Sequence, residues 1–136
     1  MSESIVIDTN ILFSALLKED SKATGIILNS NHGFFICEST IMELFKHKEK
    51  IVRLSQLPEE DLIRLFYILL RNVTVIKEDW IGLTTRRRAY VLCRDTDPAD
   101  TPFIALTLHL KGRLWTGDKA LMAGLREKGF KDFFTP

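Results

Sequence analysis

Short runs of apolar residues alternate along the chain with longer stretches whose apolar positions recur at helical spacing. Runs that are apolar at every position are typical of strands buried in a parallel sheet. We expect strands at residues 5–7, 34–37, 73–76 and 114–115, with a candidate final strand at 133–134. Between them we expect helices over residues 11–17, 21–29, 40–48, 58–70, 80–92, 103–110 and 119–128.

The clearest of these helices begins near Pro58, where proline precedes three acidic residues that complement the positive end of a helix dipole. Strands that alternate with helices indicate an α/β protein. We therefore predict a three-layer α/β/α sandwich around a mostly parallel sheet of four to five strands. The chain has 136 residues and no internal repeat or linker, so we expect a single domain over residues 1–136.

The composition limits where this protein can act and what it can bind, but it does not indicate a function. The chain is 46% hydrophobic with a net charge of +1, so attraction to nucleic acid must come from local patches. Cys37 and Cys93 are far apart and form no CxxC pair, which is typical of reduced thiols in a cytoplasmic protein. The N-terminal sequence has neither a basic segment nor a long apolar run, so we expect no secretory signal and no membrane association.

Four acidic residues lie at expected junctions between strands and helices. Asp8 follows the first strand, Glu43 lies in the first turn of the helix after the second strand, and Asp118 follows the fourth strand. Asp100 opens the apolar helix at 103–110. Because parallel sheets place their sites at the carboxyl ends of the strands, we expect these four carboxylates to converge.

Helix capping is the competing explanation for each acid. Asp8, Asp100 and Asp118 are good N-cap residues, and Thr40 with Glu43 matches a capping box. Taken singly, capping explains every one of them. Four acids gathered at one sheet edge would repel one another, however, and a hard divalent cation such as Mg²⁺ or Mn²⁺ removes that repulsion.

A carboxylate site with Mg²⁺ or Mn²⁺ suits the hydrolysis of phosphodiesters, because the metal activates water and stabilises charge on the phosphate. The three histidines, His32, His47 and His109, have no spacing typical of metal ligands. The sequence also lacks a glycine-rich phosphate loop and a GxSxG motif, which disfavours nucleoside triphosphatases and serine hydrolases.

Four segments resemble the sequence motifs of PIN domains. Residues 5–12 resemble the opening motif, 39–44 the second, 97–106 the third and 114–118 the fourth. The resemblance implies a metal-dependent nuclease that acts on single-stranded RNA, often as the toxin of a toxin–antitoxin pair and often as a homodimer. It implies that the four acidic positions are Asp8, Glu43, Asp100 and Asp118.

The resemblance also implies supporting residues around these acids. Thr9, Asn10 and Thr116 would hold them through hydrogen bonds or bound water. Asp97 lies in the same loop as Asp100 and is its alternative. We prefer Asp100 because the apolar pattern at 103–106 follows it at the expected distance.

Basic and aromatic residues near position 90 are candidates for RNA binding. Arg86, Arg87 and Arg88 cover nearly a full helical turn, so at most two of them share a face. A charged run is usually a solvated helix face, but arginines beside the site would attract a phosphate backbone. Trp80 and Tyr90 are candidates for stacking on bases.

Three other functions remain open from the sequence. One is a catalytically inactive PIN-like module that binds RNA or protein. A phosphatase of the haloacid dehalogenase type would need a second aspartate two positions after Asp8, where Asn10 stands. A receiver domain would need a phosphorylatable aspartate after the third strand, where residues 77–79 are a poor match.

Overall fold

Strand β1 (Ser4–Ile7) lies inside a four-stranded parallel sheet of order β3-β2-β1-β4 in the computed structural model, which describes residues 3–136. Its neighbours are β2 (Gly33–Cys37) and β4 (Arg113–Trp115), and β3 (Thr74–Ile76) pairs with β2. The expected strand at 133–134 is a single parallel bridge between Leu114 and Phe133. The predicted three-layer fold with a parallel sheet is confirmed.

Helices connect and cover these strands. Within residues 3–136 they are α1 (Thr9–Ala15), α2 (Lys22–Asn29), α3 (Glu38–Lys46), α4 (Lys48–Leu54), α5 (Glu59–Arg71), α6 (Leu83–Cys93), α7 (Thr101–Leu110) and α8 (Lys119–Glu127), with 3₁₀ turns η1 (Glu78–Trp80) and η2 (Pro98–Asp100). None of the helices described combines the length and apolar character needed to cross a membrane.

Four helix predictions were wrong by two or three residues at a boundary. The helix expected at 11–17 is α1 (Thr9–Ala15), and the helix expected at 103–110 begins at Thr101. The helix expected at 40–48 starts earlier, at Glu38, and gives way at His47 to α4, which the sequence reading missed. The helix expected at 80–92 begins at Leu83, because Trp80 belongs to the preceding 3₁₀ turn. The earlier start of α3 changes the position of Glu43 within its helix.

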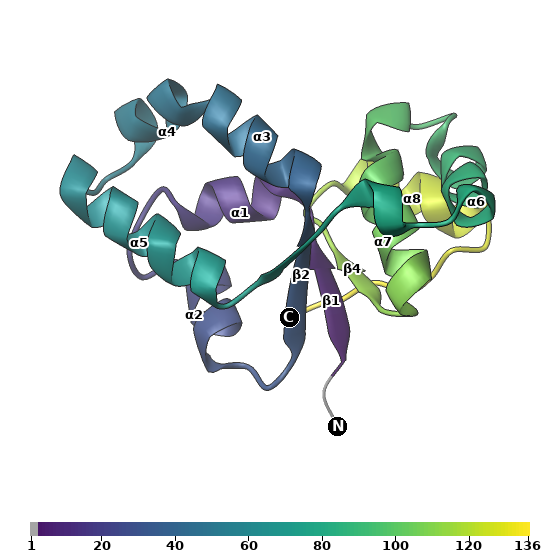
Figure 1. Cartoon of the computed structure of the whole chain (residues 1–136), viewed down its shortest axis with the longest axis horizontal. Helices are drawn as coiled ribbons and strands as arrows, with labels where there is room; N and C mark the ends of the chain where they lie inside the picture. The colour runs from purple at the N-terminus through teal and green to yellow at the C-terminus, as the bar shows by residue number, and fades with distance from the viewer. Residues whose placement is uncertain (1–2) are drawn as a thin grey trace.

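The sheet separates two apolar cores (Figure 1). Helices α1, α3, α4 and α5 lie on one side of it, and α6, α7 and α8 lie on the other. Ile5 and Ile7 of β1 belong to the first core, whereas Val6 between them belongs to the second. Successive strand side chains point to opposite faces, which is why a strand covered on both faces is apolar throughout.

The connection from α7 to β4 brings the backbone close to β1. Helix α7 ends at Leu110, and its C-cap residue Lys111 has a left-handed φ of 53°. Gly112 packs directly against the Ser4 backbone, where a Cβ atom would have no room. This glycine therefore permits the close approach of β4 to β1.

Candidate active site

Asp8 and Asp118 lie at the ends of two neighbouring strands. The β1–β4 register pairs Ile7 with Trp115, and the Asp8 amide continues the ladder by donating to the Trp115 carbonyl at 3.2 Å. The hydroxyl oxygen of Thr116 accepts the Asp118 amide at 3.1 Å, and the Thr116 side chain also hydrogen-bonds to Asp8. Thr116 therefore joins the two acids.

Capping is confirmed for these two acids. The Ile11 amide donates to Oδ1 of Asp8 at 2.9 Å, and the Leu121 amide donates to Oδ1 of Asp118 at 3.0 Å. Each cap bond engages one of the two carboxylate oxygens and restricts the side-chain rotamer. Asp8 is only 4% exposed, and its burial raises the pKa of its carboxyl, opposed by the hydrogen bond from Thr116.

Asp100 precedes α7 but does not cap it. Its side chain accepts no cap hydrogen bond from that helix. Its burial comes first among the causes that raise the pKa of its carboxyl to about 7, followed by the charges of Asp97, Asp8, Asp118 and Glu43. The carboxylates of four separate segments therefore act on one another at the carboxyl edge of the sheet.

Glu43 lies in the second turn of α3, which corrects two expectations. Because α3 begins at Glu38 with Cys37 as its N-cap, Glu43 is not in the first turn, and Thr40 with Glu43 forms no capping box. Thr40 is instead fully buried, and its hydroxyl accepts a hydrogen bond from the Thr9 hydroxyl at 3.3 Å. Glu43 is exposed, and its charge raises the pKa values of both Asp100 and Cys37.

The other expected supporting residues have different surroundings. Thr9 is buried, and its bond to Thr40 joins the start of α1 to the start of α3. Asn10 is exposed on the first turn of α1. The carboxylate of Asp97 accepts the Ala99 amide at 3.0 Å and so caps the η2 turn. Asp97 therefore supports the turn that carries Asp100.

Glu78 is a further acid beside this edge that the sequence analysis did not select as a site residue. It follows β3, and its Oε1 accepts the Ser39 amide at 3.0 Å, in the first turn of α3. Its charge raises the pKa of Cys37, as that of Glu43 does, after burial as the larger cause. The strand-end rule that selected Asp8 and Asp118 also applies to Glu78.

The sequence that carries these acids matches a known protein family. The family model of the PIN domain matches residues 6–133. The chain belongs to the PIN-domain family. PIN domains are generally nucleases and generally use divalent metals.

The fold of this PIN domain is also found in a solved structure. It is similar to the crystal structure of PAE2754 from Pyrobaculum aerophilum, with a TM-score of 0.63, 19% sequence identity, and coverage of 90% of this chain and 79% of that chain. At this identity the similarity shows the fold alone. No curated protein matches the sequence.

The donor chemistry of this PIN domain fits Mg²⁺ or Mn²⁺. Over residues 3–136, no three His, Cys, Asp or Glu side chains are arranged as a ready-made metal cage. Mg²⁺ does not require such a cage, because it keeps several waters and is usually bound through one or two carboxylates. The acids present are hard oxygen donors. Burial and, after it, the charges of the neighbouring acids raise the pKa of Asp100, and a bound cation would relieve the part that is due to repulsion.

The arginines at 86–88 are exposed on α6. The C-terminal end of this helix approaches the site through Cys93, whose Sγ lies 3.2 Å from Oγ1 of Thr101. The charges of Asp100 and Asp97 raise the pKa of Cys93, after burial as the larger cause. Helix α6 therefore flanks the candidate active site.

Proposed function

We propose that this PIN domain is an endoribonuclease that cleaves single-stranded RNA with Mg²⁺ or Mn²⁺. The main support is the raised pKa of Asp100, about 7, to which the charges of Asp8, Asp118 and Glu43 contribute along with burial. Capping accounts for the positions of Asp8 and Asp118 but not for those of Asp100 and Glu43, which make no cap bond. A metal bound at this edge gives these two acids a role that capping does not.

Asp8, Glu43, Asp100 and Asp118 would hold the ion. When bound, the ion supplies a nucleophilic water near neutral pH and stabilises the charge that develops on the phosphate. The protein contributes prior positioning, because cap bonds restrict Asp8 and Asp118, and Thr116 ties these two residues together. Asn10 is exposed on the first turn of α1, and in this proposal it supports the site from the side on which RNA binds.

The test is cleavage of a labelled, unstructured RNA with Mg²⁺, Mn²⁺ or EDTA. We expect wild-type protein to cut only with a metal, and Asp8→Asn to lose cleavage while it keeps the fold, because asparagine also caps helices. Asp20→Asn is the matched control, since Asp20 is an exposed acid in the connection between α1 and α2. In crystals soaked with Mn²⁺, we expect the ion between Asp8, Asp100 and Asp118.

Two results would replace this proposal. A wild-type protein that cuts no RNA with either metal would favour a catalytically inactive module that binds RNA or protein. Mn²⁺ bound away from Asp8, Asp100 and Asp118 would remove the metal site. The cytoplasmic location that we propose for this activity is supported by the buried, free thiols of Cys37 and Cys93.

The proposal extends to a small antitoxin protein as the partner of this domain. An apolar groove of about 300 Å³ lies between α3, α4 and α5, and exposed Phe45 and Ile63 line it together with Lys48. Phe45 is 68% exposed and Ile63 is 61% exposed, which is unusual for side chains of this size. An apolar helix with acidic flanks would cover the groove and pair with the lysine.

The partner is tested by co-expressing this chain with its neighbouring reading frames, followed by co-purification and light scattering of any small protein that binds. Phe45→Lys is expected to abolish its binding without loss of RNA cleavage. If the purified domain instead forms a homodimer that Phe45→Lys dissociates, the groove is occupied by a second copy and the antitoxin assignment is wrong.

A further inference from the structure

One face of α6 combines aromatic, apolar and cationic side chains that the fold leaves uncovered. Leu83, Arg87, Tyr90 and Arg94 follow one another at intervals of three or four residues, which places them along one side of the helix. Ala89 and Cys93 are buried on the opposite side. Tyr90 is 49% exposed although its ring is large. We use the name α6 face for the four exposed residues Leu83, Arg87, Tyr90 and Arg94.

A shallow depression accompanies the α6 face. It measures about 380 Å³ and is lined by Leu83, Arg86, Arg87, Tyr90 and Val91. Arg88 is exposed but does not line it. The triple arginine of the sequence is therefore divided, with Arg86 and Arg87 beside Tyr90 and Arg88 outside the depression.

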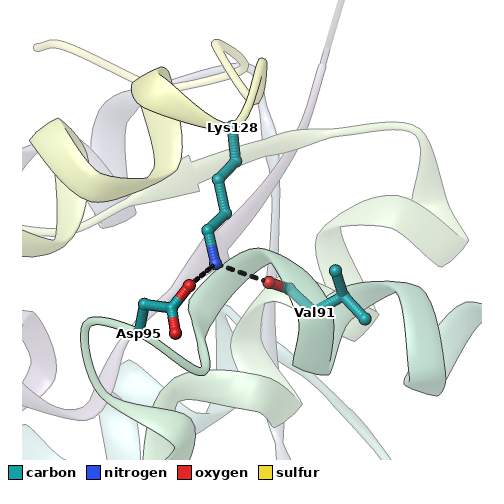
Figure 2. Close-up of polar contacts among 3 residues, drawn as sticks. All are labelled: Val91, Asp95 and Lys128. Atoms are coloured by element: carbon teal, nitrogen blue, oxygen red, sulfur yellow. Dashed lines mark hydrogen bonds and ion pairs between the residues drawn. The ribbon is translucent and has the colours of Figure 1, made fainter.

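The positive charge of the α6 face is not neutralised by the protein. No ion pair formed within residues 3–136 involves Arg86, Arg87 or Arg94. Asp95, the acid next to this helix, is instead bound by Lys128, as Figure 2 shows. The guanidinium groups of Arg86, Arg87 and Arg94 are therefore available to an external anion.

Lys128 also fixes the end of α6 (Figure 2). Its Nζ donates to the Val91 carbonyl at 2.9 Å and to Oδ2 of Asp95 at 2.5 Å. One side chain of the loop after α8 thus holds the last turn of α6 and the start of the following loop. This contact keeps the C-terminal part of the α6 face in place.

The C-terminal end of α6, where Arg94 follows Cys93, lies beside the segment that carries Asp100. The amide of Asp97 donates to the Cys93 carbonyl at 2.9 Å, and the Cys93 thiol contacts Thr101, which directly follows Asp100. A chain bound along α6 that continues past the C-terminal end of the helix would therefore reach the segment that carries Asp100. From Arg87 to Arg94 the helix rises about 10 Å, so one ligand can contact both.

We propose that the α6 face binds the part of a single-stranded RNA that adjoins the cleaved phosphate. Tyr90 stacks on a base, and Arg87 and Arg94 bind phosphates. Stacking needs an unpaired base, and arginines without protein partners favour a polyanion over an apolar protein segment. This inference rests on the proposed ribonuclease function and names the surface that recognises its substrate.

The test measures binding of a fluorescein-labelled 12-nucleotide oligouridylate in EDTA, so that cleavage does not interfere. We expect Tyr90→Ala to weaken binding roughly tenfold and Tyr90→Phe to restore it, because the ring and not the hydroxyl stacks. Arg87→Ala and Arg94→Ala should each lower the slope of affinity against salt by about one unit. Arg88→Ala is the matched control and should keep wild-type affinity.

Failure of this inference is distinguishable from failure of the proposed function. If the wild type cleaves RNA but Tyr90→Ala and Arg87→Ala bind it as tightly as the wild type, the α6 face does not bind RNA. An equal loss of RNA affinity in Arg88→Ala would also overturn the inference, because it would show that the RNA responds to the overall positive charge and not to the α6 face. If the wild type binds as expected but cleaves nothing, the α6 face stands and the ribonuclease proposal fails.

Discussion

Asp100→Asn is expected to make the metal-free protein more stable while it removes activity. In the folded protein, burial and the neighbouring acids raise the pKa of Asp100 from 3.8 to about 7. Three pKa units correspond to about 4 kcal/mol of unfavourable free energy for the charged form. Asp100 is only half-buried, and screening by water reduces this to about 1–2 kcal/mol. Asparagine has the same shape without the charge.

The expected gain depends on pH in a defined direction. Between pH 3.8 and about 7 the folded protein binds more protons at Asp100 than the unfolded chain, so this residue makes stability fall as pH rises. We therefore expect the variant and the wild type to be equally stable near pH 4. The variant should be more stable by about 1–2 kcal/mol at pH 8, measured by urea unfolding in EDTA.

Asp95→Asn is the control with the opposite sign. Its hydrogen bond to Lys128 lowers the pKa of Asp95, so this carboxylate stabilises the fold at pH values above 3.8 and the variant should lose stability at pH 8. Two results would refute the reasoning. One is an Asp100→Asn protein that is no more stable than the wild type at pH 8. The other is an equal gain in both variants, which would report net charge alone.

Three further predictions concern groups around the site. Asp118→Ala should lower the free energy of unfolding by about 1 kcal/mol through loss of the α8 cap, whereas Asp118→Asn should keep stability and lose cleavage, as urea unfolding and RNA cleavage assays will show. Glu78→Ala should destabilise the protein by about 1–2 kcal/mol, seen as a lower urea midpoint, because the Ser39 amide loses its acceptor. Gly112→Ala should be strongly destabilising, with a fall in melting temperature, because its Cβ collides with the Ser4 backbone. Unchanged stability of Asp118→Ala, Glu78→Ala or Gly112→Ala contradicts the contact behind that prediction.

The sequence pattern was most successful where local and global requirements agree. The run at residues 5–7 predicted β1 correctly, because a strand buried on both faces must be apolar at each position. Asp8 and Asp118 were located at strand ends by the same logic, and the structure adds that each also caps a helix. Capping and a site at the sheet edge are therefore compatible in one residue.

The pattern failed where a tertiary contact decides the local structure. Thr40 and Glu43 have the spacing of a capping box, but α3 begins two residues before Thr40. The Ser39 amide near the start of this helix is satisfied by Glu78, 39 residues away in sequence. The spacing of residues along α3 does not show that Glu78, at the end of another strand, supplies the acceptor for the Ser39 amide. Glu78 was therefore not selected, and the start of the helix was misplaced.

The sequence by itself determined the alternation of strands and helices, the parallel sheet and the identity of the acids, because these depend on hydrophobic periodicity and residue type. The tertiary structure alone decided which acids act on one another. The pKa of Asp100 depends on charges from residues 3 to 92 positions away, which the strand order β3-β2-β1-β4 brings to one edge. It also decided that Arg87 and Tyr90 share an open face while Arg88 does not, because packing of α6 against the core fixes its rotation.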